Sequence, residues 1–204
     1  MLQSWIDIIF PPSKHCLLLR TFSVEAFQLF YRPQKIGTVQ ILSEYNIPAV
    51  QSAVAACKFE NNQTAAKLLG GLLSLWLMEL PKVKTIFIPI PLHRKREKKR
   101  GHNQVERVLK NLPDISFHHI VCNKLLIRTH DTKPQTSLNR EDRLDNMKNV
   151  FTINKRQLKA LSSCKRVIIC DDVLTTGATL RAAKDALWPH LPPDTELICL
   201  AWAH

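Results

Sequence analysis

The sequence predicts an α/β fold in which a largely parallel sheet is flanked by helices. Buried-strand patterns at residues 85–91, 166–173 and 196–202 alternate with helical patterns, an arrangement typical of parallel strands joined by crossover helices. With 204 residues, of which 45% are apolar and 23% charged, the chain has the size and composition of one globular domain with a sizeable core, or of one domain with a small N-terminal attachment.

The first part of the chain divides into an N-terminal region and the start of a principal domain. Residues 1–45 show no clean hydrophobic period, unlike the residues that follow them. We expect these residues to form a small, mainly helical N-terminal region ahead of a domain at 46–204. The apolar spacing then predicts helices over 47–57 and 61–78, and Pro81 ends the second one.

The elements of the second part follow in order. Prolines close the strand at 85–91, and a basic run at 94–100 leads into a helix around 103–111. Residues 115–126 predict a second strand region with a polar break, and 128–146 predict a long mobile loop that ends in a short helix. The strand at 166–173, a helix at 179–188 and the strand at 196–202 complete the chain.

Two adjacent carboxylates and a hydroxyl-rich loop follow the strand at 166–173. Asp171 and Asp172 are suited to accept hydrogen bonds from ribose hydroxyls or to approach a hard cation such as Mg²⁺. The loop then supplies hydroxyls and helix-start amides that favour an anion, and it consists of Thr175, Thr176, Gly177, Ala178 and Thr179. An ordinary N-capped helix explains one Asp or one Thr. It does not explain the whole pattern, which favours a ligand site.

This stretch closely resembles the phosphoribosyl pyrophosphate (PRPP) motif of type I phosphoribosyltransferases. The resemblance implies the fold of that family and a PRPP site with Mg²⁺. It implies that Asp171 and Asp172 bracket the 2′ and 3′ hydroxyls of the ribose, act in any catalysis and approach the metal indirectly. The loop from Thr175 to Thr179 is then expected to hold the 5′-phosphate.

Three ordered blocks resemble one branch of these enzymes, the ComF family, over roughly residues 50–204. The first is Pro89-Ile-Pro-Leu-His93 with Arg94 and then Arg100-Gly-His-Asn-Gln104, and the third is the motif that begins at Asp171. The second block consists of Arg128, Thr132-Lys-Pro-Gln135, Arg143, Asn146 and Phe151. Lys58-Phe59 stands where the family usually has a lysine followed by an aromatic residue.

The resemblance implies which cations meet the pyrophosphate, a group that needs several positive charges and donors. A charge run by itself is usually a solvated face, but the blocks above give these residues a context. The candidates are Arg94, Arg100, Arg128, Lys133, Arg140, Arg143 and Lys58. Lys58 is equally explained as an exposed lysine at a helix end. Asn103 and Gln104 are expected to fix the loop or cap the next helix.

The N-terminal region departs from the family, whose members usually begin with a cysteine-rich zinc-binding segment. His15 and Cys16 cannot supply the four ligands of a tetrahedral zinc site, so we expect no zinc. The region must then bury its aromatic side chains, although these would also serve as a partner surface; they include Trp5, Phe22, Phe27 and Phe30. The six cysteines are scattered and suggest reduced residues of the core.

Charge and apolar content indicate which partners and which location to expect for the chain. A net charge of +12 implies polyanionic partners. The longest uncharged apolar stretch, 68–78, is too short to span a bilayer, and the N-terminus lacks the basic start of a signal peptide. We therefore expect no membrane span and a cytoplasmic location.

Three functions remain open at this point. The first is a ComF-type protein that binds PRPP with Mg²⁺ and supports the uptake or processing of single-stranded DNA in natural transformation, with a DNA-uptake helicase or channel component as a candidate partner. The second is a metabolic phosphoribosyltransferase that salvages a base. The third is a nucleic-acid-binding accessory whose ligand site is vestigial. The intact acidic motif disfavours the third, and the ComF resemblance favours the first over the second.

Overall fold

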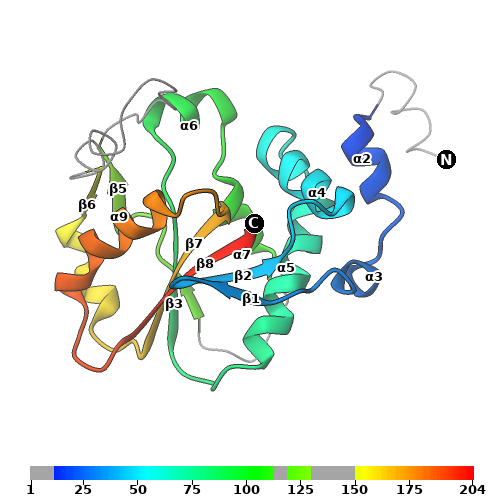
Figure 1. The fold of residues 1–204 in the computed structure, drawn as a ribbon. Coiled ribbons are helices and arrows are strands. Elements are labelled where there is room, and N and C mark those ends of the chain that lie inside the picture. The colour runs from blue at the N-terminus through cyan, green and yellow to red at the C-terminus, as the bar shows by residue number, and fades with distance from the viewer. Residues whose placement is uncertain (1–11, 113–118, 130–149) are drawn as a thin grey trace.

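The computed structural model describes residues 12–112, 119–129 and 150–204 (Figure 1). Within these ranges, six strands form one sheet in the order β1-β2-β8-β7-β3-β4, and β5 pairs with β6 in a separate ribbon. The pairs from β2 to β4 are parallel, whereas β1 runs antiparallel to β2. The strands are β1 (Gln34–Ile36), β2 (Val39–Ser43), β3 (Thr85–Pro89), β4 (His119–Val121), β5 (Leu126–Arg128), β6 (Phe151–Ile153), β7 (Arg166–Val173) and β8 (Glu196–Ala203).

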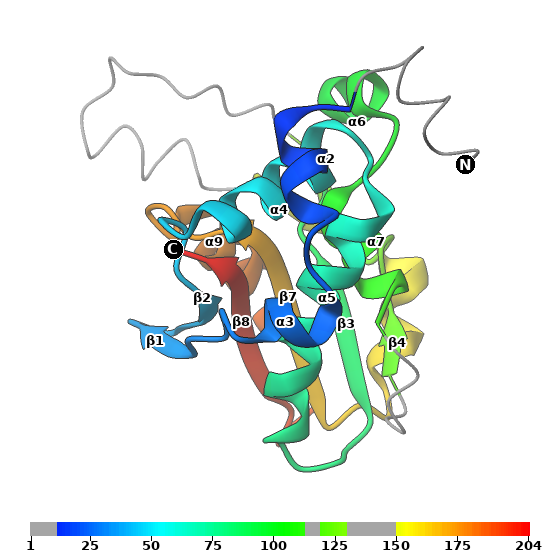
Figure 2. The same ribbon diagram turned by 90° about the vertical axis from the view of Figure 1, so that its right-hand side faces the viewer.

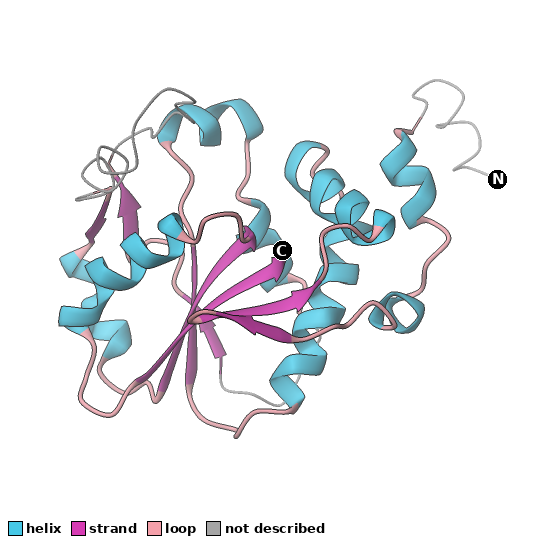
Figure 3. Ribbon diagram, in the orientation of Figure 1, coloured by secondary structure: helices cyan, strands magenta, loops and turns pink. Residues whose placement is uncertain are grey.

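Helices cover both faces of this sheet (Figure 3), so the predicted α/β class with a mostly parallel sheet is confirmed. The α-helices are α2 (Lys14–Leu19), α3 (Val24–Gln28), α4 (Pro48–Phe59), α5 (Gln63–Met78), α6 (Arg94–Arg100), α7 (Gln104–Lys110) and α9 (Ala178–Leu187). Two 3₁₀ helices, η1 (Lys155–Leu161) and η2 (Trp188–His190), complete the described elements.

The alternation of side chains along β7 divides the core into two halves. Ile168 and Cys170 pack with the helices α4, α5 and α7 on one face, whereas Val167 and Ile169 pack with α9 and η1 on the other. This alternation follows from the two-residue period of a strand. Both halves are fully apolar along the middle of β7, as expected for a parallel strand that is covered on both faces.

Trp202 ties the sheet to α5. Its side chain is 1% exposed, and its indole N–H donates a hydrogen bond of 2.9 Å to the carbonyl oxygen of Leu69. A buried indole needs such a partner because an unpaired N–H would lose its hydration. The contact fixes α5 against the carboxyl end of β8, which lies beside the carboxyl end of β7.

The sheet begins earlier in the chain than the expected division at residue 45. β2 pairs in parallel with β8, so residues of the expected N-terminal region form part of the main sheet (Figure 2). The two strands are short, and their positions depend on β8, which lies far along the chain. The N-terminal region, expected to be mainly helical, therefore contains two strands as well as the helices α2 and α3.

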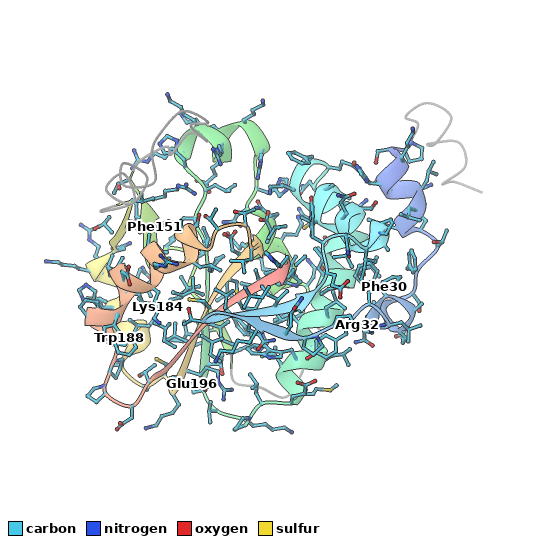
Figure 4. The ribbon with its side chains drawn as sticks, in the orientation of Figure 1. Phe30, Arg32, Phe151, Lys184, Trp188 and Glu196 are labelled. Atoms are coloured by element: carbon cyan, nitrogen blue, oxygen red, sulfur yellow. The ribbon has the colours of Figure 1, made fainter. Side chains whose placement is uncertain are left out.

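The aromatic side chains of this region pack inward. Phe27 is fully buried, and Phe22 and Phe30 meet it edge-to-face with ring centroids 5.9 and 5.5 Å away. Figure 4 shows Phe30 near Arg32 at this end of the molecule. Core packing is thus the role of these rings, as expected, while Trp5 lies outside the described residues. Cys16 donates through Sγ to Glu60 at 2.9 Å.

The basic run is itself a helix, α6, rather than a loop that leads into one. His93 caps its start by accepting from Lys95 N at 3.4 Å, and Gly101 ends it with φ 73°, a conformation that glycine adopts without a steric penalty. The helix buries none of its residues, so no apolar period in the sequence could indicate it.

Several element boundaries also differ from expectation. The described part of the strand region expected at 115–126 begins at residue 119 and contains β4. The chain then enters β5, which belongs to the separate ribbon. The loop and short helix expected at 128–146 lie almost entirely outside the described residues. No helix in the described ranges has the length and apolarity needed to cross a membrane.

Candidate functional site

Asp171 and Asp172 lie at the carboxyl end of β7 and point to opposite faces of the sheet. The period of the strand continues through both residues, so Asp172 faces α4 and α7, and Asp171 faces the side of α9. Ligands of parallel α/β sheets bind at this carboxyl edge. The two carboxylates therefore flank one strand end from both sides.

Asp172 is held by two side chains that come from different helices. Lys58 Nζ lies 2.9 Å from Asp172 Oδ2, and Gln104 Nε2 donates to the same oxygen at 2.7 Å. The other carboxylate oxygen, Oδ1, accepts from Val173 N at 2.8 Å. Asp172 is thus held in place as a hydrogen-bond acceptor. The hydroxyls of a sugar are donors too, so they suit the same carboxylate.

Gln104 joins the basic helix to this carboxylate. It is 6% exposed, and its Oε1 accepts from Arg100 Nη1 at 3.3 Å while its amide nitrogen donates to Asp172. The sequence indicated only a loop or capping role for Gln104. Asn103 is the residue that caps α7, through Oδ1 and the amides of Val105 and Glu106. No local pattern reveals the contact to Asp172, because that residue lies 68 positions away.

His102 fixes the turn between α6 and α7. One ring nitrogen lies 2.9 Å from the carbonyl oxygen of Cys57, and the other lies 2.9 Å from that of Arg100. The turn is therefore tied to α4 one residue before Lys58. These contacts hold the helix ends that carry Arg100, Gln104 and Lys58 next to one another at the edge of the site.

Asp171 sits in a less favourable environment for its charge. Its Oδ1 accepts from Asp172 N at 2.9 Å. Burial and the neighbouring charge of Asp172 raise the pKa of Asp171 to about 7, against the opposing attraction of Lys58 and Arg128. Arg128 ends β5, and its guanidinium carbon lies 5.7 Å from the centroid of the Phe151 ring of β6. The ribbon β5–β6 thus brings one expected cation toward Asp171.

The loop after β7 is anchored at its start and open at its tip. Leu174 N donates to the carbonyl oxygen of Ala203 at 2.8 Å, whereas Thr175 and Thr176 are exposed. Gly177, with φ 72°, precedes α9 and carries no side chain that caps it. A pocket of about 440 Å³ adjoins this loop, and its lining includes Arg181 and Lys184 of α9. The loop is therefore accessible to a ligand.

The remaining expected site residues are distributed unevenly. Thr179 lies half-buried in the first turn of α9, next to Ala178. Arg94 is exposed at the start of α6, the opposite end of that helix from Arg100. Lys133, Arg140 and Arg143 lie outside the described residues, so their roles remain predictions.

The carboxylates do not by themselves complete a metal site. Within the described ranges, no three His, Cys, Asp or Glu side chains gather around a common point. Mg²⁺ commonly takes one or two carboxylates and completes its shell with water and the phosphates of a ligand. Either carboxylate has the chemistry to contribute to such a shared site.

The raised pKa of Asp171 predicts a pH-dependent effect of Asp171→Asn on stability. An aspartate whose pKa is higher in the folded than in the unfolded protein lowers stability as pH rises from the unfolded pKa to the raised value, above which the full penalty is present. Well above pH 7, the variant should exceed the parent in unfolding free energy by about one to a few kcal/mol. Urea unfolding across pH measures this difference, which should shrink below the raised pKa. A difference independent of pH would contradict the assignment.

Comparison with known proteins finds a distant relative of the chain. No protein-family model matches the chain. Competence protein F of Haemophilus influenzae is 32% identical over 133 residues, which cover 60% of this chain and 55% of that protein. The chain thus spans about half the length of this relative. The chain is therefore distantly similar to a competence protein, and its mostly parallel sheet agrees with the α/β fold that the motif blocks imply.

Proposed function

We propose that this chain binds PRPP with Mg²⁺ and, as a ComF-type cytoplasmic protein, supports the uptake or processing of single-stranded DNA in natural transformation. One observation carries the proposal. Asp171 and Asp172 end β7 directly before an open, glycine-containing loop, and Lys58 and Gln104 surround one of the two carboxylates. A sugar with both hydroxyls and phosphates matches this combination of acceptors, amides and cations.

The contacts of Asp172 indicate how the ribose would enter. Lys58 and Gln104 both donate to Asp172 Oδ2, and ribose hydroxyls would replace these donors at the same oxygen. Lys58 would then be released toward the pyrophosphate, which Arg100 would also contact from its place beside Gln104. Lys58 would exchange one anion for another, whereas Asp172 would exchange a cation and an amide for neutral hydroxyl donors, so hydrogen bonds would then hold its charge.

The loop after β7 suits the 5′-phosphate. The φ of 72° at Gly177 turns the backbone into the first turn of α9, where backbone amides and the helix dipole favour an anion. Thr175 and Thr176 add exposed hydroxyls. Bound Mg²⁺ would neutralise charge on the pyrophosphate, and Asp171 and Asp172 are the residues that would hold it indirectly, through water.

The DNA role rests on charge and on the name of the relative. The chain carries a net charge of +12, and α6 presents an exposed basic surface that we call the α6 surface, formed by Arg94, Lys95, Lys98 and Lys99. Phosphate contacts supply most of the affinity of proteins for nucleic acid without sequence preference. The relative is named a competence protein, which is why we favour this role over base salvage.

Calorimetric titration tests the ligand. PRPP should bind the protein with Mg²⁺ present and bind far more weakly after chelation, whereas an equimolar mixture of ribose 5-phosphate and pyrophosphate should not reproduce the heat. Absence of PRPP binding with Mg²⁺ would refute the proposal. A screen for pyrophosphate release against candidate bases addresses the second function, and turnover with one base would favour a salvage enzyme.

Salt dependence tests the DNA role. Binding of single-stranded DNA should weaken linearly on a logarithmic plot against salt, with a slope of about −0.7 for each phosphate that a cation neutralises. Replacing Lys98 and Lys99 by alanine should flatten the slope by roughly 1.4. The matched control is Lys165→Ala, an exposed lysine that precedes β7 at the opposite edge of the sheet. Fluorescence anisotropy measures DNA binding by the parent protein, the double variant and the control. Equal salt slopes in all three would exclude the α6 surface as the DNA-binding site.

A further inference from the structure

Phe59 is an exposed aromatic residue at the rim of the candidate site. It ends α4, and 68% of its surface is exposed. Its neighbour in the chain is Lys58, which pairs with Asp172 at 2.9 Å. A single exposed apolar side chain is common on protein surfaces, so its position matters more than its exposure.

A cation holds one side of the Phe59 ring. The guanidinium carbon of Arg100 lies 5.2 Å from the ring centroid, a cation–π geometry. Arg100 also donates to Gln104, which in turn donates to Asp172. The ring is therefore connected to Asp172 by two routes, one along the chain through Lys58 and one through Arg100 and Gln104.

We infer that Phe59, backed by Arg100, is a stacking platform for a nucleobase at the mouth of this site. The open area of the ring offers a flat apolar surface, and the cations beside it suit the phosphates that accompany a base in nucleotides and nucleic acids. Aromatic rings in basic surroundings bind bases in this way without sequence preference. An aliphatic ligand would bury apolar surface on this ring but would lack the face-to-face stacking that a planar base gains. The inference rests on the proposed function in one respect, namely that the site beside Phe59 binds the phosphates of the ligand.

The base has two chemical sources that share this recognition. It belongs either to single-stranded DNA that follows the α6 surface or to a free base that approaches bound PRPP as an acceptor. Both place a planar heteroaromatic ring against Phe59. The two sources differ in whether phosphates are covalently attached to the base.

The experiment uses the full chain with Phe59→Ala, Phe59→Leu and Phe59→Trp. The first arm measures binding of an oligothymidylate and of an abasic oligonucleotide with the same number of phosphates. The second arm measures binding of free bases to protein saturated with Mg²⁺ and PRPP. Phe59→Ala and Phe59→Leu should weaken the base-containing ligand by about tenfold, because stacking on an aromatic residue contributes that much per base. Phe59→Trp should retain binding, and the abasic strand should bind all variants equally.

The outcomes decide between the sources and separate this inference from the proposal beneath it. A loss confined to the first arm assigns the platform to DNA, and a loss confined to the second assigns it to an acceptor base. Equal binding by all variants in both arms overturns the inference, even if Mg²⁺ and PRPP bind normally. Failure of PRPP to bind the parent protein would refute the proposed function, whereas the first arm would still report on Phe59. Because Phe59 is exposed, the variants should keep the parental melting temperature, which a thermal scan verifies.

Discussion

Replacing Asp171 and Asp172 together by asparagine is expected to weaken the binding of PRPP with Mg²⁺ by about a hundredfold or more. Hydrogen bonds to charged groups contribute roughly 1.5–3 kcal/mol each, and each carboxylate is assigned one or more of them to ribose hydroxyls. Asparagine keeps the size of the side chain and one acceptor oxygen, so the loss reports on charge rather than on packing. Calorimetry with Mg²⁺ and PRPP measures it directly.

The matched control for this variant is Asp194→Asn. Asp194 is exposed and has φ 62°, a conformation that asparagine also tolerates. It lies shortly before β8, at the opposite edge of the sheet from the candidate site. The control should bind PRPP as the parent protein does. Equal affinities in the parent and in the double asparagine variant would remove the roles assigned to the two acids.

The strand and the acids at its end could be predicted from the sequence because their pattern is local. The predicted bounds of β7 coincide with the observed ones, Arg166–Val173, since a continuous apolar run fits a strand buried on both faces. The helix after it differs by one residue at each end. The order of strand, acids, loop and helix therefore placed Asp171 and Asp172 at the correct edge of the sheet.

The remaining features depend on residues that are distant in the sequence or carry no apolar period. β1 and β2 have three and five residues, and their place in the sheet is set by pairing with β8 rather than by local pattern. α6 is polar on every side, and its bounds depend on the caps at His93 and Gly101. Gln104 resembles a helix-start residue, and its contact to Asp172 exists only after α7 packs near β7.

The last prediction concerns Lys58, and a double-mutant cycle with Asp172 separates its structural from its binding role. Asp172 is 14% exposed beside Lys58, so Lys58→Met leaves a largely buried carboxylate without its cation. The expected loss in unfolding free energy is about 1–3 kcal/mol. In the background of Asp172→Asn the same replacement should cost little, because no charge is then left unpaired. Urea unfolding of the four proteins measures the coupling.

Binding should follow a different rule from stability in this cycle. The double variant, Lys58→Met with Asp172→Asn, is neutral at both positions and should recover most of the stability lost by Lys58→Met. It should not recover affinity for PRPP with Mg²⁺, because both the ribose acceptor and the cation assigned to the pyrophosphate are gone. Lys58→Arg keeps the charge and should lose less affinity than Lys58→Met. If stability costs add without coupling, the ion pair contributes nothing to the fold. If the double variant binds as the parent does, Lys58 and Asp172 are a structural pair and the ligand lies elsewhere.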